Sequence, residues 1–250
     1  MELNTGTPKI QVKNLTMRFG DLTVLNDINF TVNEGEFVSI VGPTGCGKTT
    51  FLNCLSSLLT PTDGAILIDG QPADPQKHNL AFVFQENTCL PWRSVRDNVA
   101  FGMEAKNIPK AERDRRTNAI MDMAGLSSCA DLYPKQVSAS MLQRIAVSRA
   151  FAVQPDLMLL DEPYGQLDVK LRIYLEDELV KLWSKLKSTI IFITHNIEEA
   201  VYISERVLVL SPKPTTIKAD IPIDLPRPRS LVSPEFVALR RQITDLIRWW

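Results

Sequence analysis

The stretch GPTGCGKT, from Gly42 to Thr49, matches the full G-x-x-x-x-G-K-S/T pattern of a phosphate-binding loop. An apolar run, Phe37 to Val41, precedes it, and a helix is expected to begin near Lys48. Such a loop turns its backbone N–H groups around a polyphosphate, while Lys48 supplies positive charge and the Thr49 hydroxyl can hold Mg2+. The residues expected around the nucleotide are Gly42, Pro43, Thr44, Gly45, Cys46, Gly47, Lys48, Thr49 and Thr50. The pattern predicts an α/β fold that binds a nucleoside triphosphate.

Composition narrows the class of protein. With 250 residues and 44% hydrophobic content, the chain can bury one large core or two closely joined ones. Its 28 basic and 29 acidic residues leave a net charge of -1, which disfavours nucleic acid as a partner. No apolar stretch approaches the ~20 residues that cross a bilayer, and the N-terminus lacks the blocks of a signal peptide. We therefore expect a cytoplasmic protein.

The four cysteines are scattered without a C-x-x-C pair, which disfavours a metal site or a disulfide framework. Cys46 lies inside the phosphate loop, near the start of the expected helix. A helix N-terminus favours a thiolate, so the sequence predicts a lowered pKa for this thiol. We expect thiol reagents to inactivate the protein and bound nucleotide to protect it.

Hydrophobic patterning predicts strands alternating with helices, and hence a mostly parallel sheet. Turns are expected at Glu34-Gly35 and Asp63-Gly64. A helical region is expected over 86–154, with Ser94 capping its first helix, and the Pro-rich segment 212–228 is expected to be an extended linker or edge segment. Strands are predicted over 10–19, 28–32, 37–41, 65–68, 81–84, 157–160, 189–194 and 206–210, and further helices over 95–101, 110–124, 168–186 and 234–250. The apolar stripe of the last helix either docks on a membrane or, as we favour, packs on its own domain or on a sister subunit.

Polar side chains follow three of the predicted strands. Asp161 and Glu162 close the apolar strand 157–160, where a phosphate-loop fold places its metal contact and its water-activating base. His195 and Gln85 follow two other strands, and ligands gather at the carboxyl ends of strands in open α/β sheets. The alternatives are a solvated pair of acids, a surface histidine and a glutamine without a role.

In this order, the residues resemble those of the ATP-binding subunit of ABC transporters, from about Ile10 to Leu210. The matching motifs are the phosphate loop 42–49, the Q-loop Gln85, a signature at 137–141, the Walker B end at Asp161 and Glu162, a D-loop ending in Leu167-Asp168, and the switch His195. Phe19 stands where the family carries an aromatic ring that stacks on adenine, although its residue type alone favours a core position.

The resemblance implies a P-loop NTPase core with a mostly parallel sheet, an N-terminal antiparallel β subdomain and an inserted helical subdomain. The expected boundaries are 1–85 with 155–224 for the core, 86–154 for the helical subdomain and 225–250 for a C-terminal helix. ATP and Mg2+ are the implied cofactors. In the roles carried over, Thr49, Gln85 and Asp161 hold the metal, and Glu162, Gln85 and His195 are catalytic.

The family also forms nucleotide-sandwich dimers, in which the signature of one subunit closes over the ATP of the other. Here Ser138 and Ser140 would make that contact. The chain reads VSASM where the family usually has LSGGQ, so Ala139 and Ser140 replace two glycines. A side chain at 140 should weaken closure or misplace the phosphate, while the helix N-terminus still favours an anion. Gln166 and Asn196 are smaller departures from the family pattern.

The segment from Gln85 to Val95, with Pro91-Trp92, resembles importer ATPases of the nitrate, sulfonate, taurine and bicarbonate group. The chain is also too short for the extra β domain of sugar and polyamine importers. The resemblance implies a transmembrane permease contacting Leu90 to Arg96, a solute-binding protein as an indirect partner, and a position on the inner face of the membrane. Trp92 packed locally on a surface loop is the alternative.

Two other functions compete. The altered signature allows a regulatory subunit that does not hydrolyse ATP and pairs with another ATPase. An ABC-type ATPase acting on nucleic acid or ribosomes is disfavoured by the near-neutral charge and by the single cassette. The sequence leaves the solute open, and it does not distinguish a homodimer from a heterodimer.

Overall fold

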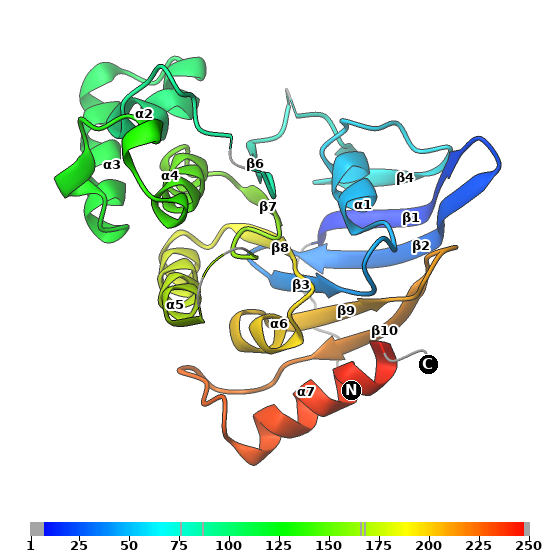
Figure 1. Cartoon of the computed structure of the whole chain (residues 1–250). Helices are drawn as coiled ribbons and strands as arrows, with labels where there is room; N and C mark the ends of the chain where they lie inside the picture. Colours follow the sequence, from blue (N-terminus) through cyan, green and yellow to red (C-terminus); the bar gives the residue numbers. More distant parts are fainter. Residues whose placement is uncertain (1–7, 76, 87, 166, 168, 248–250) are drawn as a thin grey trace. The chain divides into compact units, whose positions relative to one another are not determined.

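A computed structural model describes residues 8–75, 77–86, 88–165, 167 and 169–247 (Figure 1). The chain divides into two compact units. The first unit combines the residues up to Leu80 with those from Ser188 onward, and the second unit contains Ala81 to Lys187. The expected helical subdomain 86–154 falls inside the second unit, and the finer domain boundaries stay predictions.

The first unit begins with an antiparallel sheet. Strand β1 (Pro8–Phe19) pairs with β2 (Leu22–Asn33) on one side and with β4 (Asp63–Ile68) on the other, and the short β5 (Gln71–Pro72) extends it beyond β4. The turn expected at Asp63-Gly64 is wrong, because these residues open β4. Gly64 has a φ of 84°, and a Cβ there would collide with the backbone of Asn14. Glycine therefore lets the two strands approach, rather than turning the chain.

The second sheet of this unit surrounds the strand before the phosphate loop. Strand β3 (Phe37–Val41) lies parallel to both β8 (Thr189–Ile193) and β9 (Arg206–Leu210). All residues of β3 and β8 are buried, which explains why both strands are apolar runs without alternation. The Pro-rich segment contributes β10 (Ile217–Pro222), an antiparallel strand on β9. The predicted mostly parallel arrangement is confirmed here.

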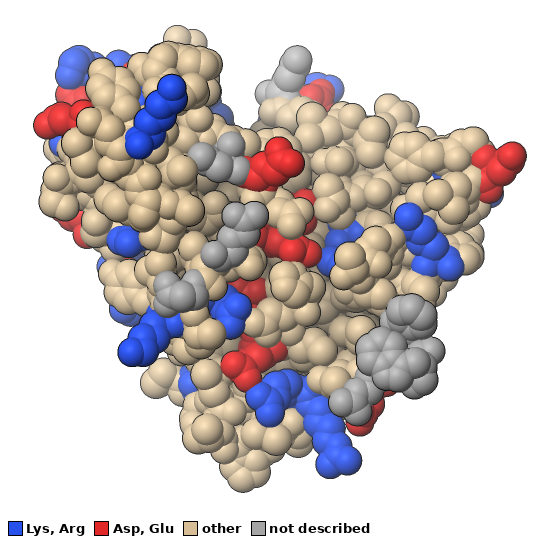
Figure 2. Space-filling view, viewed as in Figure 1, with Lys and Arg blue, Asp and Glu red and all other residues tan. Residues whose placement is uncertain are grey.

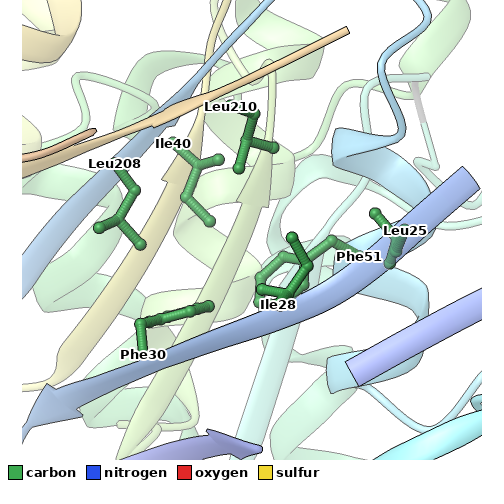
Figure 3. Close-up of a pocket in the computed structure, with 7 residues that line it drawn as sticks. All are labelled: Leu25, Ile28, Phe30, Ile40, Phe51, Leu208 and Leu210. Atoms are coloured by element: carbon green, nitrogen blue, oxygen red, sulfur yellow. The ribbon is translucent and has the colours of Figure 1, made fainter. Parts of the chain in front are cut away.

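An apolar core joins the two sheets to helix α1 (Lys48–Leu55), which follows the phosphate loop. Figure 3 shows a small cavity in this core, and Phe51 of α1 lies 5.5 Å from Phe30 of β2, measured between ring centroids. The cavity is lined by Leu25, Ile28, Phe30, Ile40, Phe51, Leu208 and Leu210. Since these side chains come from β2, β3, α1 and β9, the core ties the helix to both sheets.

Helices α6 (Ile197–Ile203) and α7 (Pro234–Ile247) pack together beside β9 in the first unit (Figure 1). Phe236 and Ile243 of α7 are fully buried in a cluster with Val201. The favoured interpretation of the apolar stripe, packing on the protein itself, is confirmed. Trp250, also assigned to the stripe, lies outside the described residues.

The second unit is mainly helical. Strands β6 (Leu80–Val83) and β7 (Leu157–Asp161) lie side by side, and the helices are α2 (Val95–Ala105), α3 (Lys110–Met123), α4 (Ala139–Ala152) and α5 (Val169–Leu186). Two 3-10 turns cover Ser127–Cys129 and Pro134–Gln136. Helix α2 packs against α3 and α4. Ser94 caps α2 as predicted, and α2 runs four residues beyond its expected end at 101. None of the helices described in either unit is long and apolar enough to span a membrane.

Candidate nucleotide site

The phosphate loop occupies the connection from β3 to α1, and two of its glycines have left-handed backbone. Gly45 has a φ of 76° and Gly47 a φ of 110°, conformations that residues with a side chain rarely adopt. A Cβ on Gly47 would lie 2.7 Å from Cγ1 of Val24, closer than van der Waals contact. Gly47 is also the N-cap of α1 and contributes no side-chain cap, so the first N–H groups of the helix face a ligand without competition.

Lys48 is buried, and its ammonium donates hydrogen bonds to the carbonyl oxygens of Gly42 and Pro43, each at 3.1 Å. The loop thus holds its own cation against the backbone that curves around the binding position. Thr44 and Thr49 are exposed, and Thr50 is half-buried. The Thr49 hydroxyl at the start of α1 is therefore accessible to a cation accompanying phosphate.

The turn between β9 and β10 braces the loop from behind. Thr215 donates its hydroxyl to the carbonyl oxygen of Cys46, and its backbone N–H donates to Val24 O at 2.9 Å. A Cβ on Gly42 would lie 3.0 Å from Cβ of Leu210. This brace could not be predicted, because no sequence pattern links Thr215 to Cys46, 169 residues earlier.

The prediction of a lowered pKa for Cys46 is wrong. Its side chain is only 2% exposed, and burial raises the pKa of the thiol even though the charge of Lys48 acts in the opposite direction. The free-energy cost of removing a thiolate from water is larger here than the stabilisation that the helix N-terminus and the charge of Lys48 provide. The expected inactivation by thiol reagents loses this support and stays a prediction.

Two other predicted residues of the first unit lie at strand ends. His195 lies two residues beyond the end of β8, which is the parallel neighbour of β3, so His195 and the phosphate loop leave the sheet at the same edge. Its side chain is exposed. Phe19 ends β1 and is 48% exposed, which excludes the core position that its residue type favoured.

The acidic residues lie in the second unit. Asp161 ends β7 with its side chain 3% exposed, and Glu162 follows with a φ of 45°. Left-handed backbone at a residue other than glycine is strained and clusters at functional positions. Gln85, just beyond β6, donates to the Glu162 carboxylate with 3.4 Å between Nε2 and Oε2. The structure therefore brings Gln85 and Glu162 together at the ends of adjacent strands.

These residues fit Mg2+ better than a metal that needs a complete protein cage. Asp161 and Gln85 offer the oxygen ligands that this ion prefers. Within the described parts of the chain, no three histidine, cysteine or acidic side chains gather into a metal site. Mg2+ is usually held by one or two carboxylates together with water and substrate phosphates, which matches so sparse a set.

The signature segment forms the start of α4. Ser138 is the N-cap, and its hydroxyl accepts a hydrogen bond from Met141 N at 3.3 Å. The hydroxyls of Ser138 and Ser140 lie 2.8 Å apart, within hydrogen-bond distance. Ala139 and Ser140, which replace two glycines of the family pattern, thus add side-chain atoms at this helix end. The Ser140 hydroxyl contacts that of Ser138 directly. The D-loop residues Gln166 and Asp168 lie outside the described residues.

The loop from Leu90 to Arg96 presents Trp92, whose side chain is 71% exposed. This exposure excludes the local packing considered from the sequence. Arg93 lies over the ring of Phe101, 5.0 Å from its centroid, and its guanidinium is 2.6 Å from the Glu104 carboxylate. The loop therefore holds an exposed indole beside a fixed cation.

A buried asparagine fixes the shape of this loop. Asn98 is fully buried; its side chain accepts from Leu90 N at 2.8 Å and donates to the carbonyl oxygens of Leu90, Arg93 and Ser94. Arg149 of α4 donates to the same side chain at 2.6 Å. Sequence reasoning missed both residues, since an asparagine and an arginine inside helices carry no pattern that indicates such a network.

Surface charge agrees with the near-neutral composition. On the face shown in Figure 2, basic and acidic side chains are interspersed and residues of other types form most of the surface. This face offers no extended basic surface of the kind that binds nucleic acid.

Comparisons with known proteins point in one direction. The family model described as ABC transporter matches residues 25–165. An uncharacterized ABC transporter ATP-binding protein of Methanocaldococcus jannaschii is 43% identical, with 96% of this chain and 91% of the relative covered. A nitrate import ATP-binding protein of Synechocystis is 36% identical over 92% of this chain and 90% of its own length.

The fold has a close structural counterpart. A dimeric ATP-binding cassette in a post-hydrolysis state, bound to ADP and Pi, superposes with a TM-score of 0.77 and 30% sequence identity. The match covers 86% of this chain and 99% of that cassette. The observed α/β architecture is therefore that of an ATP-binding cassette.

Proposed function

This chain belongs to the ABC transporter family of ATP-binding proteins, and we propose that it hydrolyses Mg-ATP to power the import of a small anion or small organic solute. ATP binding and ATPase activity follow from the family. The observation that carries hydrolysis by this chain is the hydrogen bond from Gln85 to Glu162, beside the buried Asp161. It holds a carboxylate in strained backbone, which supports the proposed role of Glu162 as the water-activating base.

Each predicted residue then has a task. The phosphate loop and Lys48 bind the phosphates, and Phe19 stacks on adenine. Glu162 accepts the proton of the attacking water, and His195 contacts the γ-phosphate. Thr49, Asp161 and Gln85 would hold Mg2+, which would supply positive charge to neutralise the phosphate oxygens.

The working unit would be a dimer. The structural counterpart is itself dimeric, and we propose that Ser138 and Ser140 of one subunit close over the nucleotide of the other. ATP would contact both subunits in the closed dimer and the products would not, so hydrolysis shifts a two-state equilibrium.

Coupling to transport would use the loop from Leu90 to Arg96. An exposed Trp92 on a loop fixed by Asn98 is a rigid aromatic anchor, the kind of residue that dominates interface energetics. We assign this loop to a transmembrane permease, with the chain on the cytoplasmic face of the membrane and a solute-binding protein as an indirect partner. The nitrate import relative supports nitrate among the proposed solutes, which are of the nitrate, sulfonate, taurine or bicarbonate type.

A regulatory subunit is the second candidate, and the Ser138–Ser140 contact favours it. A hydroxyl occupied by its neighbour is less available to a phosphate. Such a subunit would bind ATP without hydrolysing it and would pair with another ATPase.

The deciding experiment measures Mg-ATP hydrolysis by the purified chain across protein concentrations, for wild type, Glu162→Gln and the control Asp131→Asn. Removing a general base should lower turnover about 100- to 10,000-fold, while Asp131, an exposed acid of the second unit, should be replaceable. A rate that rises steeply with concentration supports the homodimer. Nucleotide binding without turnover in wild type supports the regulatory candidate, and normal turnover in Glu162→Gln contradicts the assigned base.

A further inference from the structure

Helix α6 begins directly after His195 and contains only seven residues. A helix of this length is not stable by itself, because nucleation costs more free energy than so few hydrogen bonds return. Its position therefore depends on the groups that hold its two ends. Whatever holds α6 also determines where His195 lies.

The N-terminal end is tied to the residues on either side of His195. The Asn196 side chain accepts from Glu198 N at 3.0 Å and from Glu199 N at 3.3 Å. Thr194 donates its hydroxyl to the Glu199 carboxylate and accepts from Asn196 N at 2.9 Å. Since His195 lies between two residues bound to the first turn of α6, a shift of the helix carries the histidine with it.

The C-terminal end is held by two arginines from a segment more than twenty residues later. Arg229 is 8% exposed, and all its described hydrogen-bond partners are backbone carbonyl oxygens. They are Val201 at 2.7 Å, Tyr202 at 3.1 Å, Ser204 at 2.5 Å, Ile223 at 3.1 Å and Leu225 at 3.3 Å. Arg227 adds bonds to the carbonyl oxygens of Tyr202 at 3.3 Å and Ile203 at 2.5 Å.

This arrangement suits a helix end. The last carbonyl groups of a helix have no partner within it, and the negative end of the helix dipole favours a cation. Burial, together with the charge of Arg227, lowers the pKa of Arg229 to about 10, so the guanidinium stays charged at neutral pH. A buried charge is weak evidence for added stability. Its planar fork of donors instead fixes several carbonyl groups at one point.

A third arginine holds the side of the helix. Arg240 of α7 lies 2.6 Å from the Glu198 carboxylate, and both side chains are partly exposed. Beneath them, Val201 of α6 packs in the same cluster as Phe236 and Ile243 of α7. Helix α6 is thus clamped at its end and along its side by residues 223–243.

We propose that Arg229 is a positioning residue for His195, acting through α6, with Arg227 and Arg240 completing the clamp. The consequence for catalysis rests on the proposed role of His195. Substituting lysine at 229 keeps the charge but loses the fork, so α6 and His195 shift in a protein that remains folded. Misplacing a catalytic group by about 1 Å costs up to ~100-fold in rate. We expect kcat to fall about 10- to 100-fold with KM for ATP nearly unchanged.

The chain offers a direct readout, because His78 and His195 are its only two histidines. In a His78→Gln background, the imidazole NMR signals come from His195 alone. We expect Arg229→Lys to shift or broaden them. The matched control is Arg206→Lys, which disturbs an arginine bound to Glu36 and Asp220 in the same unit and should leave the signals in place. Thermal melts of both variants verify that the protein is folded.

Exchanging the charges of Glu198 and Arg240 gives a second test that does not depend on whether Arg229→Lys folds. Glu198→Arg and Arg240→Glu should each displace the His195 signals slightly, and the double variant should restore them. Unchanged signals in Arg229→Lys, folded at the measuring temperature, would overturn the proposal. Shifted signals together with normal hydrolysis by His195→Ala would leave the clamp standing and remove the assigned role of the histidine.

Discussion

Helices α1 and α4 are both proposed to present their N-termini to nucleotide, yet the two ends are built differently. Gly47 caps α1 with a φ of 110° and without a side-chain hydrogen bond. Ser138 caps α4 with its hydroxyl, which also contacts Ser140. The N-terminus of α1 leaves its backbone N–H groups for a ligand, whereas the N-terminus of α4 uses one of its N–H groups to bond the Ser138 hydroxyl.

The two helix ends differ in how tightly their surroundings are packed. At α1, Val24 lies close to Gly47 and Leu210 lies close to Gly42, so a Cβ added at either glycine must displace part of the core. At α4 the cap is exposed and its hydroxyls have room to rotate. Substitutions at the first end should therefore destroy the site, and substitutions at the second should tune it.

The largest expected effect is that of Gly47→Ala. Alanine at this φ is strained and its Cβ meets Val24, so we expect ATP binding to weaken about 10- to 100-fold. Isothermal titration with ATP measures the change. Gly70→Ala is the control, because Gly70 has a similar positive φ of 74° but no atom within 4 Å of its Cβ and lies outside the loop. Equal losses of ATP affinity in both variants would break the comparison.

Ser138→Ala should have the next largest effect. Losing a serine N-cap costs about 1 kcal/mol of stability, and losing the proposed donor to phosphate should lower kcat about tenfold. Ser94→Ala is a matched control, because Ser94 caps α2 through the same side-chain bond. Thermal melts should show similar losses for the two variants, whereas hydrolysis should fall only in Ser138→Ala. A fall in both would assign the effect to stability.

Ser140→Gly should act in the opposite direction. Removing the hydroxyl that engages Ser138 frees it for phosphate, so turnover should rise about two- to fivefold, in line with the net value of one hydrogen bond. Steady-state hydrolysis at saturating Mg-ATP measures it. An unchanged or lower rate would show that serine at this position does not impair the signature.

The smallest effect concerns Cys46, behind the α1 end. Burial raises its pKa, so the thiolate fraction is below that of a free thiol at every pH below the raised value and increases as the pH rises. Iodoacetamide at pH 8 should alkylate Cys46 more slowly than glutathione, as followed by mass spectrometry of the peptides. Rapid labelling would show that the packing around the loop opens readily.

Residues whose role depends on neighbours in sequence were predictable. The phosphate loop, the Ser94 cap and the apolar strands β3 and β8 each follow from local pattern, because turn geometry, capping and burial act over a few residues. Asp161 and Glu162 were placed from the strand that precedes them. The family resemblance added Phe19, and it supported the roles of Gln85 and His195, whose positions at strand ends left other interpretations open.

Residues whose role depends on distant contacts were not predictable. Thr215 and Arg229 bond to backbone carbonyl groups, which every residue carries, so no pattern in the sequence identifies their partners. The pKa of Cys46 was misjudged for a related reason. Its local helix position indicated a lowered value, while its burial comes from packing that is brought together only in the folded unit.

The brace behind the phosphate loop has a consequence for synthesis. Strand β3 obtains its two neighbours, β8 and β9, from near the end of the chain, and Thr215 is made 169 residues after Cys46. A nascent chain that has exposed the whole glycine-rich loop still lacks Thr215 and the two strands that flank β3. Contacts of such long sequence separation form late and slowly. Affinity for ATP is therefore acquired only after β8, β9 and Thr215 have been made, and nucleotide stabilises chains that contain them rather than shorter ones.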